Sequence, residues 1–214
     1  MRLLPNTVRL LCLAALLAFA CVPAFAKDAL PADLAAKIDR IANDALKQSG
    51  VPSASVAVVR DGKLVYAKAY GDARLDPKTP ATASMRYSIG SISKEFTAAA
   101  ILMLQQQGKL NLDDKVAKFF PDLTDADHVT IRQILSHTSG YQDFWPQDYL
   151  MPMMKQSTTP AHIMDVWAKK PLDFAPGSQW QYGNTGYTIA GAIVQKLPGQ
   201  TPFEFLQQHV FPTL

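Results

Sequence analysis

The sequence predicts an α+β fold in which an antiparallel β-hairpin accompanies a large helical block. Two runs rich in β-branched and aromatic residues, SASVAVVR and KLVYAKAY, stand side by side near the start of the chain. Apolar residues at helical spacing dominate the part that follows. The 214 residues are 48% hydrophobic, as is typical of a globular protein. We find no internal repeat and no linker, so one domain is expected after the leader.

The first 26 residues have the features of a secretory signal peptide. Arg2 and Arg9 precede or flank an apolar run, and the segment AFA at 24–26 supplies the small residues of a cleavage site. Residues 1–26 are therefore predicted to be removed and residues 27–214 to form the folded domain. The expected location is the periplasm or the outside of the cell.

The cysteines and the charge balance exclude several classes of protein. Cys12 and Cys21 both lie in the leader, so its removal would leave no thiol, no disulfide and no cysteine metal ligand. In the alternative, Cys21 is the acylated first residue of a lipoprotein. The formal charge of +3 falls to +1 without the two arginines of the leader, so no nucleic-acid partner is expected. No later apolar run reaches the roughly 18 residues of a transmembrane segment.

Local patterns predict each element of the fold in turn. Apolar residues recur at helical spacing over 33–49, and Gly50 is a typical stop. Asp61-Gly62 suits the two-residue type I′ turn of a hairpin, after which a polar loop is expected over 71–84. A turn and a short helix are expected within 110–123. Further helices are expected from the serine-containing segment to Gly108, from Thr130 to Gly140, and at about 160–169, 184–197 and 202–210.

Two features of this layout need an explanation. Residues 141–160 are rich in Pro, Met and aromatic residues without periodicity, and such irregular segments inside compact domains are often functional. A lone hairpin is marginally stable in water, so more strands are expected to pair with it. None is recognisable after Asn184, and only the first hairpin of the sheet is predicted to be present.

Ser91 and Lys94 stand three residues apart at the start of the longest apolar helix, which places both side chains on one face. Serine needs an adjacent base to act as a nucleophile, and a desolvated lysine can take its proton. The helix N-terminus also offers N–H groups to a developing oxyanion. In the structural alternative, Ser91 caps the helix and Lys94 is solvated. One S-x-x-K is expected by chance in a chain of this length.

Tyr182 and Asn184 form a Tyr-x-Asn directly before another predicted helix. A phenol beside a lysine ammonium is stabilised as the phenolate, so Tyr182 could move protons between Ser91 and a leaving group. Asn184 has a donor and an acceptor for an amide of the substrate. The alternative makes Tyr182 an aromatic residue at the edge of the core and Asn184 an N-cap.

Three ordered motifs, SISK, ILSHTSG and FAPGSQWQYGNTGY, resemble the serine hydrolase family of class C β-lactamases, DD-peptidases and related esterases. The segments LQQQGKLNLDDKVAKFFPDL and GQTPFEFLQQHVFPTL are also similar, so the resemblance covers about 34–214. It implies a β-lactamase/transpeptidase-like fold. It also implies the roles of the acylated nucleophile for Ser91, its proton acceptor for Lys94, the general base and acid for Tyr182, and a substrate-amide contact for Asn184.

The chain departs from the family pattern at two places. Gly183 stands in the middle of Tyr-x-Asn where the family usually has a side chain, which predicts a more flexible loop. The third motif, Lys or His followed by x-Gly on a strand, has no match in 185–214, which contains only KLPG. The chain is therefore interpreted as the N-terminal part of such a domain, without the C-terminal strands, the second oxyanion donor and the residue that binds the substrate carboxylate.

Other candidate groups point to structural roles. The four histidines have no metal-ligand spacing, so neither a metal nor a cofactor is expected. His137 is interpreted as a residue that fastens a loop, because the chain has no G-x-S-x-G for a triad. Phe144, Trp145 and Trp180 line the cleft or serve only to pack. A core-forming stripe is expected from Phe96, Ala99, Ala100, Met103 and Leu104.

The sequence thus predicts an exported serine hydrolase that forms an acyl-enzyme from an ester, a D-amino-acid peptide or a β-lactam. Esterase or peptidase activity is favoured, because nothing in the sequence specifies a lactam. The expected partner is a small-molecule or peptide substrate, and the oligomeric state stays open. One alternative is a truncated or inactive pseudoenzyme that binds peptidoglycan-like ligands without turnover. Another is a structural cell-wall protein, in which Ser91→Ala would change no activity.

Overall fold

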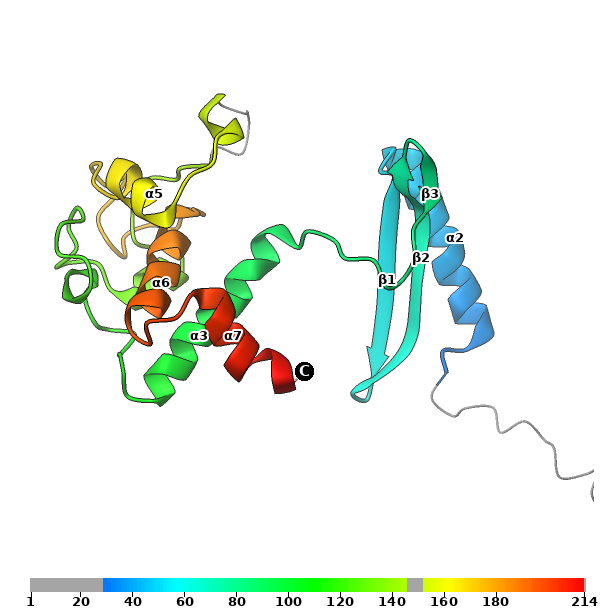
Figure 1. The fold of residues 1–214 in the computed structure, drawn as a ribbon, viewed down its shortest axis with the longest axis horizontal. Coiled ribbons are helices and arrows are strands. Elements are labelled where there is room, and N and C mark those ends of the chain that lie inside the picture. Colours follow the sequence, from blue (N-terminus) through cyan, green and yellow to red (C-terminus); the bar gives the residue numbers. More distant parts are fainter. Residues whose placement is uncertain (1–28, 146–151, 214) are drawn as a thin grey trace, which may run out of the picture. The chain divides into compact units, whose positions relative to one another are not determined.

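The computed structural model describes residues 29–145 and 152–213. The predicted leader, with its cleavage site and Cys21, lies outside these residues. The chain divides into two compact units, one up to Tyr87 and one from Ser88 onward, and each is considered by itself (Figure 1). The single domain over 27–214 stays a prediction. Within the described ranges, no helix combines the length and the apolar character needed to cross a membrane.

The first unit contains a helix, α2 (Ala32–Ser49), and a three-stranded antiparallel sheet. Strand β1 (Ser53–Arg60) pairs with β2 (Lys63–Leu75) across the two-residue turn that the sequence predicts. Asp61 and Gly62 have φ angles of 51° and 74°, the left-handed values that a type I′ turn requires. The helix and the hairpin predicted for this part of the chain are therefore confirmed.

Strand β3 (Lys78–Pro80) is the element that the sequence did not predict. The polar loop expected over 71–84 is wrong at this point, because β2 continues to Leu75 and β3 folds back to pair with its end. The described sheet therefore has three strands and extends beyond the first hairpin. All three residues of β3 are exposed, so the strand has no alternation of apolar and polar residues that would reveal it.

Asp39 of helix α2 ties this helix to the sheet. Its carboxylate accepts hydrogen bonds from the Lys68 ammonium at 2.8 Å, the Tyr70 phenol at 2.7 Å and the Tyr66 phenol at 2.8 Å. The bonds from Lys68, Tyr70 and Tyr66 lower the pKa of Asp39 to about 2. The carboxylate therefore stays ionised at neutral pH and keeps these three partners on strand β2.

The second unit is built around two helices, α3 (Ser93–Gln106) and α6 (Thr185–Lys196), which contact each other. Helix α7 (Pro202–His209) packs against both, while α4 (Ile131–Leu135) and α5 (Pro160–Trp167) pack against α6 (Figure 1). Short 3₁₀ turns cover Gly90–Ile92, Val116–Lys118, Pro152–Lys155 and Phe211–Thr213.

Helix α4 is shorter than expected. The predicted end at Gly140 is wrong, because His137 has a φ of 61° and a right-handed helix cannot continue through this conformation. The short helix expected within 110–123 is reduced to the 3₁₀ turn Val116–Lys118. The helices near 160, 184 and 202 begin where they were predicted, at Pro160, Thr185 and Pro202.

The core of the second unit lies where α3 and α6 meet. Ile101 and Leu104 of α3 and Ile189 and Ile193 of α6 are fully buried, and Phe205 of α7 is almost so. Each such side chain contributes about 1.5–3 kcal/mol relative to an exposed one. Of the expected stripe, Ala100 and Leu104 are buried, and Phe96 and Met103 pack against the core from partly buried positions. This packing holds α3 and α6 at a fixed distance.

Gly140 determines the path of the chain between α4 and the irregular segment that follows. Its φ is 85°, and a Cβ at this position would lie 2.3 Å from the carbonyl oxygen of Phe174. The Gly140 carbonyl in turn accepts the N–H of Asp173 at 2.8 Å. Only glycine permits this close approach, which directs residues 141–145 toward the N-terminal end of α6.

Candidate active site

Ser91 lies in the 3₁₀ turn Gly90–Ile92, directly before helix α3. It therefore stands at the N-terminal end of this helix, as predicted, where the helix dipole favours developing negative charge. Neither the turn nor the helix has a side-chain cap, so Ser91 is not the capping residue of the structural alternative. Its Oγ instead lies 2.5 Å from Oη of Tyr182.

The ammonium of Lys94 connects the four predicted site residues. Lys94 Nζ donates to Tyr182 Oη and Asn184 Oδ1, both at 2.7 Å, and to Ser91 Oγ at 3.2 Å. It also lies 4.8 Å from the centre of the Tyr182 ring and 5.7 Å from that of Tyr187. Lys94 is half-buried, so it is not the solvated lysine of the structural alternative.

The environment of Tyr182 favours its phenolate. Burial alone would raise the pKa of Tyr182, but the hydrogen bonds with Lys94 and Ser91, together with the Lys94 charge, outweigh burial and lower it. A phenolate here would have the Ser91 hydroxyl within hydrogen-bond distance. The geometry thus places a phenol with a lowered pKa within hydrogen-bond distance of the serine hydroxyl.

His137 supports the segment that carries Tyr182. Its Nδ1 accepts the N–H of Gly183 at 3.3 Å, and its carbonyl accepts the N–H of Gln181 at 3.0 Å. The imidazole ring lies 4.7 Å from the Tyr182 ring and is tilted by 34°. The interpretation of His137 as a residue that fastens a loop is confirmed. The Gly183 backbone is thereby held, and the nearest neighbours of a methyl group there would be Asp143 and Tyr141 at ordinary contact distance.

His137 should make this unit less stable in acid. Burial lowers the pKa of His137, as does the charge of Lys94, and Asp143 opposes them without cancelling the shift. The native chain therefore binds fewer protons than the unfolded chain. The contribution of His137 to stability is complete above about pH 6.5, the pKa of an unperturbed histidine, and is lost as the pH falls through the native pKa. Protonation of Nδ1 also removes the acceptor for the Gly183 N–H.

This prediction is checked by urea unfolding at pH 7 and pH 5. The free energy of unfolding should fall more between these values in the wild type than in His137→Asn. Asparagine tolerates the positive φ of this position and does not titrate, so the difference between the two chains reports the protonation of His137. An equal fall in both chains would contradict the prediction.

Asp143 is the site residue that the sequence analysis missed. Its carboxylate accepts the backbone N–H of Asn184 at 2.8 Å and the Asn184 amide group at 3.1 and 3.2 Å. It also accepts the N–H of Trp145 at 3.2 Å. Asn184 occupies the N-cap position of α6 but makes no side-chain capping bond, which decides against the capping alternative. With its nitrogen held by Asp143, Asn184 presents Oδ1 to Lys94.

Thr185 fixes the same loop to helix α6 at a second point. Its fully buried hydroxyl donates to the carbonyl of Gln142 at 2.6 Å and accepts the N–H of Phe144 at 3.2 Å. Residues 142–145 are therefore bonded to the first residues of α6 on both sides of Asp143. The segment that the sequence left irregular begins as a well-anchored loop.

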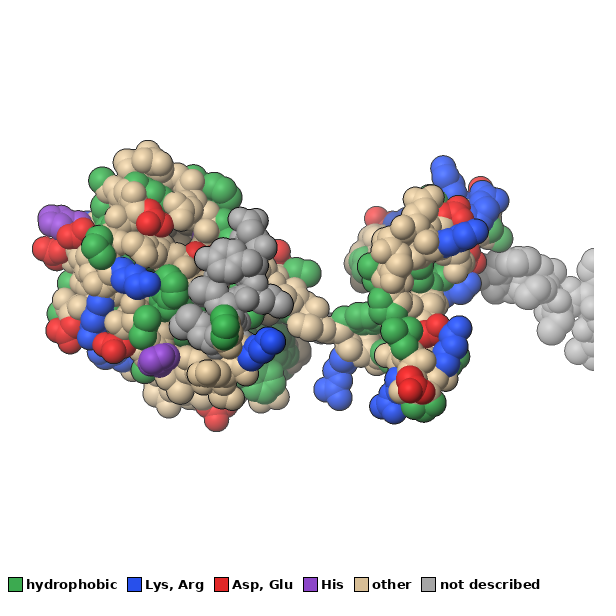
Figure 2. All heavy atoms as spheres, turned by 90° about the horizontal axis from the view of Figure 1, so that it is seen from above, with side chains coloured by type: hydrophobic (Ala, Val, Ile, Leu, Met, Phe, Trp, Pro, Cys, Tyr) green, Lys and Arg blue, Asp and Glu red, His purple; other side chains and the backbone are tan. Residues whose placement is uncertain are grey.

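Ser91, Lys94, Tyr182 and Asn184 line a hollow of about 370 Å³ at the N-terminal ends of α3 and α6. Phe144 and Trp145 line it, as one of the two interpretations proposed. Trp180 is not part of this lining; it is 66% exposed and contacts His137 edge-on. Among the described residues, no three His, Cys, Asp or Glu side chains gather in a way that could hold a metal ion. Acidic and basic side chains are interspersed on the face of this unit that Figure 2 shows.

Comparison with known proteins identifies the family. Residues 38–214 match the family model described as Beta-lactamase. The chain belongs to the Beta-lactamase family. Among curated relatives, Protein flp of Staphylococcus aureus (strain MW2) is 32% identical over 179 residues, which are 81% of this chain and 35% of the relative.

Two solved structures of Beta-lactamase-family relatives show the same fold. The D-amino acid amidase from Ochrobactrum anthropi SV3, complexed with L-phenylalanine amide, has a TM-score of 0.77 at 30% identity and covers 84% of this chain and 49% of its own. A class C β-lactamase in complex with cefoxitin has a TM-score of 0.70 at 28% identity, with coverage of 84% and 49%. This chain spans about a third of the length of the curated relatives it matches and about half that of these solved chains.

These similarities confirm the predicted resemblance and the β-lactamase/transpeptidase-like fold. They relate the chain to serine hydrolases of several activities, among them a β-lactamase and an amidase. Membership of the Beta-lactamase family does not by itself assign a role to any residue. That assignment depends on the geometry of the hollow.

Proposed function

We propose that the protein is a serine hydrolase in which Ser91 forms an acyl-enzyme. One observation carries this proposal: Ser91 Oγ, Lys94 Nζ and Tyr182 Oη lie within 2.5 to 3.2 Å of one another. A nucleophile, a cation and a phenol in mutual contact meet the geometric requirement for activating a serine. The family membership of the chain supports the same chemistry.

In the proposed reaction, Tyr182 takes the Ser91 proton as Oγ attacks the carbonyl carbon of the substrate. The ammonium of Lys94 stabilises the phenolate before this transfer, and the N-terminal end of α3 stabilises the oxyanion that develops. Tyr182 then gives the proton to the leaving group as the bond to it breaks. In the second half of the cycle, Tyr182 takes a proton from a water molecule that attacks the carbonyl carbon of the acyl-enzyme. Tyr182 then gives this proton to Ser91 Oγ as the bond between Oγ and the acyl group breaks, which releases the acid and regenerates Ser91.

Asn184 has two proposed roles in this cycle. Its Oδ1 holds Lys94 Nζ in position at 2.7 Å, and its amide group lines the hollow, where it can bind an amide of the substrate. Asp143 orients Asn184 by accepting its backbone and side-chain N–H groups. We therefore assign Asp143 as a positioning residue.

Esters and amides of amino acids are the substrates we propose, in preference to β-lactams. The similarity to the D-amino acid amidase supports this choice, since its structures have TM-scores of 0.72 to 0.77, against 0.70 to 0.71 for the class C β-lactamases. We also propose that the protein acts in the periplasm or outside the cell. The predicted leader over residues 1–26 supports this location.

The proposal is tested by intact-mass measurement of the folded chain after incubation with a fluorophosphonate and, separately, with a penicillin. We expect one fluorophosphonate adduct per chain, which disappears in Ser91→Ala. Ser93→Ala is the matched control, because Ser93 lines the same hollow, whereas the hydrogen bonds of Lys94 and Tyr182 go to Ser91, Asn184 and each other. Absence of an adduct in wild-type chain shown to be folded by circular dichroism would favour the inactive pseudoenzyme. An adduct that survives Ser91→Ala would refute the assignment of the nucleophile.

A further inference from the structure

Tyr187 presents its aromatic ring to the ammonium of Lys94 from the first turn of helix α6. The centre of the ring lies 5.7 Å from Lys94 Nζ, within the range of a cation–π contact. Tyr187 follows Asn184 by three residues, which places both side chains on one face of α6. Helix α6 therefore reaches Lys94 with two groups, an amide oxygen and an aromatic ring.

The hydrogen bonds of Lys94 do not balance its positive charge. All three N–H donors of the ammonium are used by Ser91, Tyr182 and Asn184, and none of these acceptors is charged while Tyr182 carries its proton. Within the ranges that the structure describes, Lys94 forms no ion pair with a carboxylate. It lies in the first turn of α3 and contacts the N-cap residue of α6, so the positive ends of two helix dipoles are close to it. The electron-rich face of an aromatic ring supplies negative potential at such a position.

The side chain of Tyr187 is held in place at its hydroxyl and at its ring. The hydroxyl donates to the carbonyl of Leu135, the last residue of α4, at 3.0 Å. The ring lies 5.2 Å from the His137 ring with a tilt of 38°, and the His137 ring in turn contacts Tyr182. Burial raises the pKa of Tyr187, so its phenol keeps the proton at neutral pH and remains a donor. The ring is thus fixed relative to both the lysine and the tyrosine of the proposed proton transfer.

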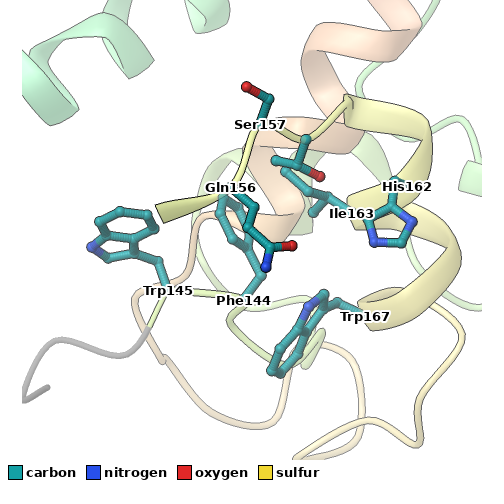
Figure 3. Close-up of a pocket in the computed structure, with 8 residues that line it drawn as sticks. Phe144, Trp145, Gln156, Ser157, His162, Ile163 and Trp167 are labelled. Carbon is teal, nitrogen blue, oxygen red and sulfur yellow. The ribbon is translucent and has the colours of Figure 1, made fainter. Parts of the chain in front are cut away.

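Tyr187 also borders a cavity of about 230 Å³ against α5. Among the described residues of its lining none is charged, so this cavity brings no ion that would compete with Lys94 for the ring. Ile163 belongs to this lining and is shared with the cavity drawn in Figure 3. Open space beside the ring also means that the fold should accept other side chains at position 187.

We propose that Tyr187 is a positioning residue of the site, whose ring stabilises the ammonium of Lys94 and holds it against Tyr182 during proton transfer. This role matters most after Tyr182 has taken the Ser91 proton, because Lys94 then has no anion beside it. The inference rests on the proposed function and adds a residue that acts through Lys94.

The variants Tyr187→Phe and Tyr187→Leu separate the ring from the hydroxyl. Both lose the bond to Leu135, but only phenylalanine keeps a ring beside Lys94. We expect the rate of fluorophosphonate labelling at neutral pH to fall about 2- to 30-fold in Tyr187→Leu, the effect of removing one cation–π contact, and to be largely retained in Tyr187→Phe. The pH–rate profile of Tyr187→Leu should also move to higher pH, since a displaced ammonium lowers the pKa of Tyr182 less. Tyr187→Met has no ring either and should behave like Tyr187→Leu, so it takes its place if circular dichroism shows the leucine variant to be unfolded.

An NMR titration without substrate separates this inference from the proposed function. In chain labelled at the tyrosine Cζ atoms, the signal that Tyr182→Phe removes reports the ionisation of Tyr182. Its midpoint should lie at higher pH in Tyr187→Leu than in the wild type, and close to the wild-type value in Tyr187→Phe. The other titratable groups around Tyr182, namely Lys94, His137 and Asp143, are the same in these chains.

The two measurements together distinguish the possible failures. The expected midpoints in a chain that forms no fluorophosphonate adduct would refute the hydrolase and leave the positioning of Lys94 by Tyr187 standing. Labelling at Ser91 with an unshifted midpoint in Tyr187→Leu, or with an equal shift in Tyr187→Phe, would overturn the role of the Tyr187 ring alone.

Discussion

Replacing Lys94 by methionine should slow the acylation of Ser91 by about 10²- to 10⁴-fold, the usual contribution of a general acid–base system. Methionine retains most of the length of the side chain but donates no hydrogen bond to Ser91, Tyr182 or Asn184. Without the ammonium, the pKa of Tyr182 should rise, because the hydrogen bond and charge of Lys94 lower it in the native chain. The serine would then lose its proton acceptor near neutral pH.

The rate of fluorophosphonate labelling, followed by intact mass between pH 6 and pH 10, checks this prediction. In Lys94→Met the labelling rate should rise only at higher pH than in the wild type. Lys169→Met is the matched control, since Lys169 forms an exposed pair with Asp165 four residues earlier on α5. Such pairs contribute only about 0.3–0.5 kcal/mol, so this variant should label normally. A normal rate in Lys94→Met would exclude Lys94 from the activation of Ser91.

Replacing Asp143 by alanine should lower kcat/KM by about 10- to 100-fold, although Asp143 contacts neither Ser91 nor Tyr182 directly. The change leaves two groups of Asn184 and the N–H of Trp145 without their acceptor. Each lost hydrogen bond to a charged group is worth about 1.5–3 kcal/mol, shared between stability and activity. Asn184 would then no longer hold Lys94 in place.

The variant Asp143→Asn distinguishes a positioning role from a purely structural one. Its amide oxygen can still accept a hydrogen bond from Asn184, so part of the activity should return. Removal of the negative charge should also lower the pKa of Tyr182, since Asp143 raises it in the native chain. The pH–rate profile of Asp143→Asn should therefore shift to lower pH, which a loss of folded chain would not produce.

Asp173→Ala provides the control for both Asp143 variants. Asp173 is an exposed carboxylate of the same unit that binds the side chain of Gln181, the neighbour of Tyr182, and makes no contact with Asn184. Replacing Asp173 by alanine should leave the pH–rate profile unshifted. An unshifted profile in Asp143→Asn, or an equal loss of activity in Asp173→Ala, would contradict the role of Asp143.

Local signals in the sequence were sufficient for most of the fold. Asp61-Gly62 set the hairpin and Gly50 the end of α2, because turns and helix ends depend on the backbone preferences of a few neighbouring residues. Strand β3 escaped prediction because pairing with β2, and not burial, maintains it. Helix α4 ended early because of the left-handed conformation at His137, which residue spacing does not reveal.

The site was predicted only in part, for a similar reason. The motifs identified Ser91, Lys94, Tyr182 and Asn184, and the structure brings these four together. Asp143 binds Asn184 from 41 positions earlier in the chain and stands in a segment without periodicity. Such a contact results from the packing of the loop on α6, so no local pattern of residues predicts it.

The packing of α3 against α6 determines the distances between the polar atoms of the site. Ser91 and Lys94 belong to the start of one helix, and Tyr182 and Asn184 to the approach to the other. A helix rises about 1.5 Å per residue, so sliding α3 along α6 by a single residue would displace Lys94 by more than half the length of its 2.7 Å bonds to Tyr182 and Asn184. The packed apolar side chains of the two helices thus set the distances across which the proposed proton transfer takes place. Substitutions among these side chains can lower the catalytic rate although every polar atom of the site is retained.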